Sequence, residues 1–119
     1  MIYANPNHEG SVIHFKGRYE NYIDGGWVPP VKGQYLDNPS PVNGEVFCQV
    51  PRSTAEDIEL ALDAAHRAFA LWGQTSVTQR SNILLRIADR IEQNLEMLAV
   101  AETWDNGKAV RETLAADLP

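Results

Sequence analysis

Cysteine and long apolar runs are scarce in this sequence. Cys48 is the single cysteine among 119 residues, so an intrachain disulfide is impossible and a reducing compartment is favoured. No apolar stretch approaches the roughly 20 residues that a membrane helix needs, and residues 1–20 contain no apolar segment typical of a signal peptide. We therefore expect a soluble, cytoplasmic protein with no membrane partner.

Positive charge is also scarce. The 10 basic residues are outnumbered by 16 acidic ones, and they are scattered along the chain, so we expect no nucleic-acid partner. The sequence contains neither of the glycine-rich phosphate loops, GxGxxG or GxxxxGK. It also contains no Ser-His-Asp set and no His/Cys cluster with metal-binding spacing. These patterns therefore give no catalytic and no cofactor-binding residue.

Hydrophobic residues make up 44% of the chain and include three tryptophans, which is enough for a core and too apolar for a disordered chain. The length fits one small domain or part of a larger one. Residues 1–20 show no sustained periodicity and carry Pro6 and Gly10. We expect this segment to be an extended arm.

Residues 21–51 combine turn residues with short β-forming runs. Asp24-Gly25-Gly26 predicts a tight hairpin, because these residues tolerate positive φ angles. Further strands are expected at 34–37 and 45–50, and the alternation in the last one puts Val46, Cys48 and Val50 on one apolar face. Cys48 is therefore expected to be a small buried hydrophobe rather than a nucleophile.

Residues 54–119 show helical periodicity. Two capping boxes fit the start of this region, Ser53 with Glu56 and Thr54 with Asp57. A further box begins a second helix, Gly73 ends the first, and Asn94 interrupts the second. Apolar residues recur at steps of three and four on both helices, notably Ile58, Leu62, Phe69, Ile87 and Ile91.

A tight corner between helices is expected at residues 102–108. Gly107 can take the left-handed conformation that closes a helix, and a second helical run follows from Ala109 to Ala116. Trp104 is the expected packing anchor of this corner. From its position alone, Asp105 would cap the helix or pair with a neighbour there.

Five short motifs occur in a familiar order and spacing: YIDGGWV at 22–28, NPSPVNGEV at 38–46, TAEDI at 54–58, RSNILL at 80–85 and ETWDNGK at 102–108. Together they resemble the N-terminal quarter of the NAD(P)-dependent aldehyde dehydrogenases. The bacterial enzymes that oxidise acetaldehyde and other short aldehydes are the most similar group. One departure is Ala109, where many members have proline.

The resemblance implies an α/β parent protein with a Rossmann-type cofactor domain, of which this chain supplies β-hairpins followed by three or four amphipathic helices. Residues 1–20 would be the arm, and 21–119 an incomplete N-terminal part of that domain, with hairpins over 21–51 and helices over 54–119. In the family, a cysteine thiolate attacks the aldehyde and hydride passes to NAD or NADP. The residues for this chemistry lie beyond Pro119 in the family, so the chain itself would be an inactive fragment of a homo-oligomeric enzyme.

The resemblance also implies a monovalent cation site for potassium or sodium. Its ligands would be the backbone carbonyls of Leu36 and Asp37 and the carboxylate of Asp105, because hard cations prefer oxygen donors. The alternative, in which Asp105 only caps or pairs at the helix corner, remains open. A second function also remains open, namely a stand-alone helical interaction or oligomerisation module without catalysis.

Overall fold

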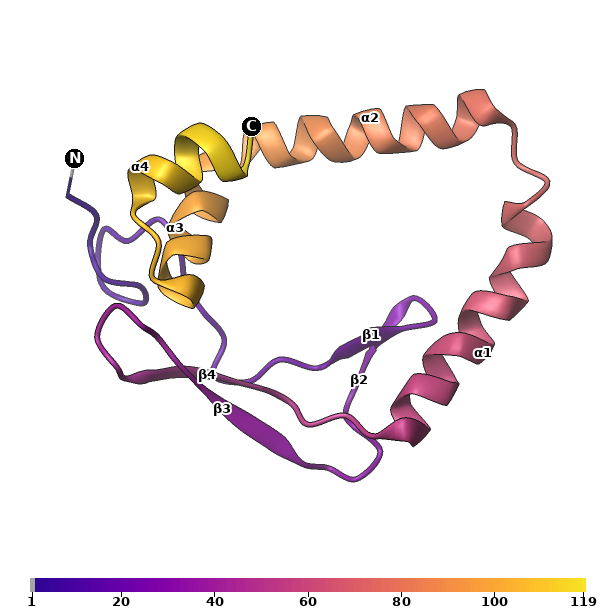
Figure 1. The fold of residues 1–119 in the computed structure, drawn as a ribbon, viewed down its shortest axis with the longest axis horizontal. Coiled ribbons are helices and arrows are strands. Elements are labelled where there is room, and N and C mark those ends of the chain that lie inside the picture. The colour runs from indigo at the N-terminus through magenta and orange to yellow at the C-terminus, as the bar shows by residue number, and fades with distance from the viewer. Residues whose placement is uncertain (1) are drawn as a thin grey trace.

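The computed structural model describes residues 2–119, in which two antiparallel strand pairs precede the helices (Figure 1). The strands are β1 (Asn21–Ile23), β2 (Gly26–Val28), β3 (Tyr35–Pro39) and β4 (Val46–Pro51). The helices are α1 (Ala55–Trp72), α2 (Val77–Gln93), α3 (Leu95–Asn106) and α4 (Val110–Glu112), followed by the π-helical segment η1 (Thr113–Asp117). The expected order of hairpins and then helices is confirmed.

The β1–β2 hairpin follows from its turn residues. Ile23 pairs with Gly26, so Asp24 and Gly25 form a two-residue turn, and both have positive φ angles, 54° and 79°. This geometry matches the twist of the two strands. Tyr22 faces Trp27 across the hairpin, with ring centroids 5.0 Å apart in an edge-on arrangement.

The β3–β4 hairpin contains an irregularity that the alternation did not reveal. Asn38 pairs with Cys48 whereas Pro39 pairs with Val46, so Phe47 is an extra residue in β4. Cys48 is buried as expected, at 5% exposure, but Val46 is 55% exposed. The expectation that Val46 and Cys48 share one apolar face was therefore wrong, because the bulge interrupts the period of two.

The N-terminal arm lies along β4. The Tyr19 N–H donates to the Gln49 carbonyl, and the Gln49 N–H donates to the Gly17 carbonyl, each at 2.9 Å. Phe15 packs on Phe47 with ring centroids 4.7 Å apart. Arm, β4 and β3 thus lie side by side, with β4 in the middle and β3 at one edge.

The start of α1 uses one of the two capping boxes that the sequence allowed. The Asp57 carboxylate accepts hydrogen bonds from the Thr54 N–H at 2.8 Å and from the Val31 N–H at 2.8 Å. Asp57 is 3% exposed, whereas Ser53 instead bonds to Asn21 in β1. The carboxylate therefore joins the helix start to the loop after β2.

The other helix boundaries follow the sequence closely. Ser76 caps α2 together with Gln79, and Asn94 separates α2 from α3. The run expected from Ala109 to Ala116 differs from a regular helix, because α4 has only three residues and continues as the π-helical η1. The wider π turn places Thr113 against α3, a tertiary contact that local helix propensity cannot encode.

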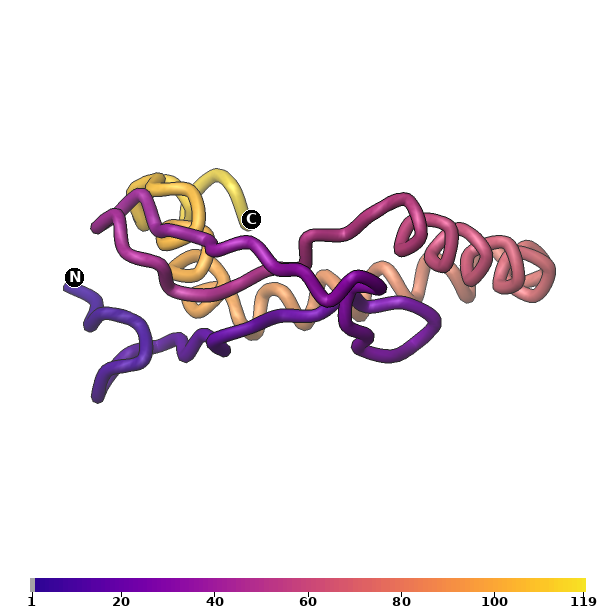
Figure 2. Tube along the Cα trace, turned by 90° about the horizontal axis from the view of Figure 1, so that it is seen from below, coloured from indigo at the N-terminus to yellow at the C-terminus, as the bar shows by residue number. Residues whose placement is uncertain are grey.

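The chain buries little of its own surface. Its radius of gyration is 17.4 Å, compared with about 13.5 Å for a compact domain of this length. Its accessible surface is 8664 Å², compared with about 6,450 Å² for a folded monomer of this mass. Figure 1 shows α1 and α2 as two sides of an open frame, and Figure 2 shows that frame edge-on.

Buried hydrophobic residues are correspondingly few over residues 2–119, namely Cys48, Ala99 and Val100. Two of these belong to α3, where Ala99 lies against Thr113 of η1, and the third belongs to β4. None of the described helices is both long and apolar enough to cross a membrane.

Candidate cation site

The site begins at the C-terminal end of α3. Gly107 has φ +79°, and its N–H donates to the Thr103 carbonyl at 2.8 Å. A Cβ at this position would lie 2.9 Å from the Cβ of Pro41, closer than side-chain carbons approach. Both backbone conformation and space therefore require glycine here.

The loop between β3 and β4 is fixed to this helix end by Ser40, which is 1% exposed. The Ser40 hydroxyl donates to the backbone carbonyl of Trp104 and accepts the N–H of Val42. The Ser40 N–H donates to the Glu45 carbonyl at 2.9 Å. Through these bonds, one buried serine closes its own loop and satisfies a carbonyl of α3 that the helix leaves unpaired.

The expected anchor, Trp104, has another role. Its side chain is only partly buried and lines a polar pocket of about 260 Å³ with residues of the arm and of the β3–β4 loop. The side chains that fill the corner are Val100 and Thr113, at 1% and 0% exposure. Trp104 is therefore not among the fully buried side chains of the corner, and its backbone carbonyl accepts the hydrogen bond from the buried Ser40.

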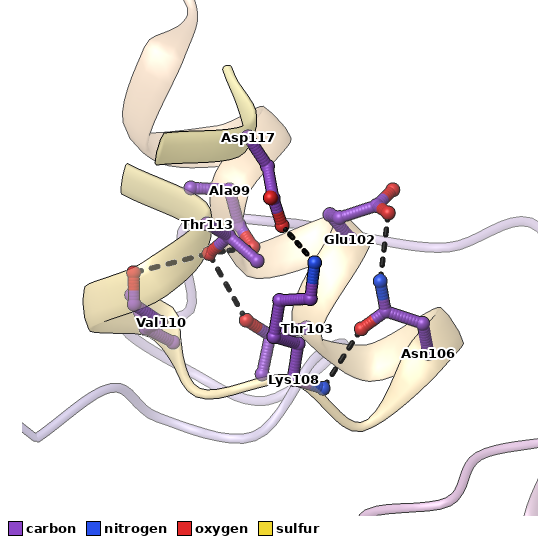
Figure 3. Close-up of polar contacts among 8 residues, drawn as sticks. All are labelled: Ala99, Glu102, Thr103, Asn106, Lys108, Val110, Thr113 and Asp117. Atoms are coloured by element: carbon purple, nitrogen blue, oxygen red, sulfur yellow. Dashed lines mark hydrogen bonds and ion pairs between the residues drawn. The ribbon is translucent and has the colours of Figure 1, made fainter. Parts of the chain in front are cut away.

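Thr113 joins the last helical segments to α3 (Figure 3). Its hydroxyl lies 3.0 Å from both the Ala99 and the Val110 carbonyls and 3.2 Å from the Thr103 hydroxyl. The Lys108 ammonium also donates to the Asp117 carboxylate at 2.7 Å, and Asp117 raises the pKa of Lys108. These contacts hold η1 against the end of α3.

The Asp105 carboxylate points away from its own helix. Its Oδ1 accepts a hydrogen bond from the Asn38 side-chain amide at 2.8 Å. The neighbouring Asp37 carboxylate accepts the Gln49 amide, also at 2.8 Å. The structure therefore brings Asp105 next to the residue that follows Asp37, although 67 positions separate Asn38 and Asp105 in sequence.

The pairing of β3 with β4 determines the direction in which each backbone carbonyl of β3 points. Gln49 uses its N–H and its C=O on the arm, so the opposing Asp37 forms a non-hydrogen-bonded pair of the ladder. The Asp37 carbonyl consequently faces the open edge of β3. Leu36 pairs with Val50, and its carbonyl is turned toward β4, where only the second lone pair is free for a cation.

These residues fit a monovalent cation in their chemistry, because the donors are a carboxylate and peptide carbonyls. They do not fit a transition metal: over residues 2–119, no three His, Cys, Asp or Glu side chains gather as ligands. The geometry leaves both interpretations of Asp105 standing, since its bond to Asn38 occupies only one oxygen.

Cys48 lies beside the same corner and is unsuited to nucleophilic attack. Burial raises the pKa of its thiol, the Asn38 amide lowers it, and the Asp105 charge raises it further, with a net rise. A thiol with a raised pKa stays protonated at neutral pH. The expected structural role of Cys48 therefore agrees with its surroundings.

Sequence reasoning missed the three side chains that assemble the corner, which are Asn38, Ser40 and Thr113. The first two belong to a run of turn residues, 38–44, and that run indicated only that the chain reverses. Nothing in the local pattern distinguishes Thr113 from an ordinary helical threonine. Their partners lie 14 to 67 residues away.

With this geometry in view, the comparison with known proteins is decisive: the chain belongs to the aldehyde dehydrogenase family, whose family model matches residues 27–119. An acetaldehyde dehydrogenase of Pseudomonas aeruginosa is 71% identical over 119 residues. A long-chain-aldehyde dehydrogenase of Acinetobacter sp. is 69% identical over 119 residues. The chain is covered completely in both matches and spans 24% of the length of each relative.

The fold is shared as well. The crystal structure of PnpE in complex with nicotinamide adenine dinucleotide superposes with a TM-score of 0.83 and 37% sequence identity. The match covers 85% of this chain and 21% of the PnpE chain. The resemblance expected from five short motifs is therefore confirmed.

Proposed function

We propose that this chain is the N-terminal part of an enzyme that oxidises an aldehyde to the carboxylic acid with NAD or NADP. The observation that carries this proposal is the family match over residues 27–119. The NAD complex of PnpE, a protein of similar fold, supports the choice of cofactor. Within the enzyme, residues 21–119 belong to the cofactor-binding domain and residues 1–20 form the arm.

In this proposal, the reacting groups are supplied by residues outside the chain. Cys48 is buried, and burial raises the pKa of its thiol, so the thiol stays protonated at neutral pH. We expect the full-length protein to form NADH from acetaldehyde and NAD, and the 119 residues alone to form none. NADH absorbance measures both, and turnover that copurifies with the 119-residue chain would contradict this assignment.

The substrate that we propose is acetaldehyde or another short aldehyde. The two relatives named above differ in the aldehyde that their names specify, and they are almost equally similar to this chain. Comparing kcat/KM for acetaldehyde and decanal in the full-length protein tests the assignment. A higher kcat/KM for decanal would reverse it, and the same assay with NADP in place of NAD decides the cofactor.

We also propose a potassium or sodium site formed by the carbonyls of Leu36 and Asp37 and the carboxylate of Asp105. Support comes from the Asn38–Asp105 hydrogen bond, which holds the acid beside this part of β3. Adding potassium at constant ionic strength should raise the apparent Tm of the full-length protein, since a ligand that binds only the native state stabilises it. Asp105→Ala should remove the rise, and an equal response in both proteins would leave Asp105 as a pairing acid.

We infer further that the full-length enzyme is a cytoplasmic homo-oligomer. The resemblance to the family suggests this assembly. Large apolar side chains of α1 and α2 are exposed in the 119-residue chain, and exposed apolar surface favours association of that chain. The same surface is the only support for the alternative, a helical interaction module without catalysis. Sedimentation of the full-length protein together with the NADH assay separates the two, because a module would associate without turnover.

A further inference from the structure

Asn38 occupies the junction between β3 and the end of α3. It directly follows Asp37, and its side chain reaches the Asp105 carboxylate at 2.8 Å. The same amide nitrogen lies 3.7 Å from the Cys48 sulfur. A primary amide has two N–H groups, so one points at Asp105 and the other at the thiol, a weak acceptor.

This contact gives one carboxylate oxygen of Asp105 a hydrogen bond and leaves the other oxygen without one. Among residues 2–119, the Asp105 carboxylate receives a hydrogen bond only at Oδ1. The donor is neutral, so the charge of the carboxylate is retained. Lys108, the base nearest in sequence, is paired with Asp117 instead.

We propose that Asn38 is a positioning residue for the cation site. Its amide holds Asp105 by Oδ1 and leaves Oδ2 without a hydrogen-bond partner among residues 2–119, so that Oδ2 is available to the cation. This inference rests on the cation site proposed above. It assigns to Asn38 a role distinct from that of Ser40, which fixes the same loop to α3 without touching the carboxylate.

The surroundings fix the backbone of Asn38. It is paired with Cys48 in the ladder, and the following loop is held on α3 by the buried Ser40. The side-chain amide therefore extends from a fixed backbone position and reaches Asp105 at 2.8 Å. Partners that orient a metal ligand typically contribute on the order of 10-fold or more to metal affinity.

The test measures the potassium concentration that gives half of the Tm rise in the full-length protein at constant ionic strength. Asn38→Ala should raise that concentration about 10-fold. Asn38→Gln, which keeps an amide, should recover part of the loss. Ser40→Ala is the matched control: it should lower the Tm in the absence of potassium and leave the half-saturating concentration unchanged.

The outcomes distinguish an error in the cation site from an error in the role of Asn38. If the wild-type protein shows no potassium response, the cation site is wrong and this inference falls with it. If the wild type responds and Asn38→Ala keeps the same half-saturating concentration, the site stands and the role of Asn38 is overturned. Where Asn38→Ala does not fold, Asn38→Ser, whose hydroxyl is too short to reach Asp105, replaces it with the same expectations.

Discussion

The corner formed by β3, β4, α3 and η1 differs in kind from the pair of long helices α1 and α2. The largest fully buried side chains of residues 2–119 are Val100, Thr113 and Ser40, and all three lie at the corner. In contrast, α2 has no buried residue, and α1 buries only Asp57, at its first turn. The corner is held by its own contacts, whereas the long helices present apolar faces to solvent.

The difference shows that amphipathic periodicity and burial are separate properties. The apolar stripe read from the sequence is present on both helices, but its members are 37–72% exposed: Ile58, Leu62, Phe69, Ile87 and Ile91. At the corner, in contrast, polar groups do the fixing, and no buried side-chain polar atom of the described residues lacks a partner. Hydrogen bonds can hold a small unit with few apolar contacts because each buried donor or acceptor left unpaired is costly.

The largest effect is expected from breaking the corner with Gly107→Val. A β-branched residue at φ +79° is strained, and its Cβ would overlap Pro41. We expect a loss of about 4 kcal/mol in the free energy of unfolding of the full-length protein, measured by denaturant titration. Lys108→Ala, one residue away with an exposed side chain, is the control and should change stability far less. Equal losses in the two variants would contradict the strain argument.

A smaller effect is expected from the other region, at Ile87 of α2. In the 119-residue chain this side chain is 50% exposed, so Ile87→Ala should leave its unfolding almost unchanged while reducing hydrophobic-dye binding and association. In the full-length protein we expect a loss of about 2 kcal/mol, because other parts of the enzyme would cover the face. Asp89→Ala on the same helix is the control. An equal change in both forms would mean that the face stays exposed.

The Thr113 hydroxyl gives a finer test of the corner. Thr113→Val keeps the shape but removes the bonds to Ala99 and Thr103, at an expected cost of about 1–2 kcal/mol. Thr113→Ser keeps the hydroxyl and should cost less. Hydrogen exchange of the amides over 110–117 should accelerate in the valine variant. If it accelerates equally in the serine variant, packing of the methyl group rather than hydrogen bonding holds η1.

The smallest effect concerns the first turn of α1. The N–H groups of Thr54 and then Val31 lower the pKa of the Asp57 carboxyl. Because the folded pKa is depressed, the contribution of the charge to stability is complete above the unfolded pKa, near about 4, and disappears as pH falls through the lower folded value. Asp57→Asn should therefore lower the Tm at neutral pH, and the gap to wild type should close below about pH 4. A constant gap would assign the effect to the exchange of an acceptor oxygen for an NH2 group rather than to charge.

Elements governed by neighbouring residues were predictable from the sequence. The Asp24-Gly25 turn, the capping pair Ser76 and Gln79, and the left-handed Gly107 each depend on residues within about four positions of one another. The choice between two capping boxes at α1 was different. It was decided by the Val31 N–H, which comes from the loop after β2 and bonds to Asp57 rather than to Glu56.

The sequence by itself thus determined the order of hairpins and helices, the family, and the position of the corner. Tertiary structure alone decided the bulge at Phe47, the π turn after α4 and the meeting of Asn38 with Asp105. The physical reason is how far apart in sequence the interacting groups lie. Turns, caps and amphipathic faces are set by local conformational preference, whereas these three features depend on which distant backbone and side-chain groups satisfy one another once β3 and β4 pack against α3.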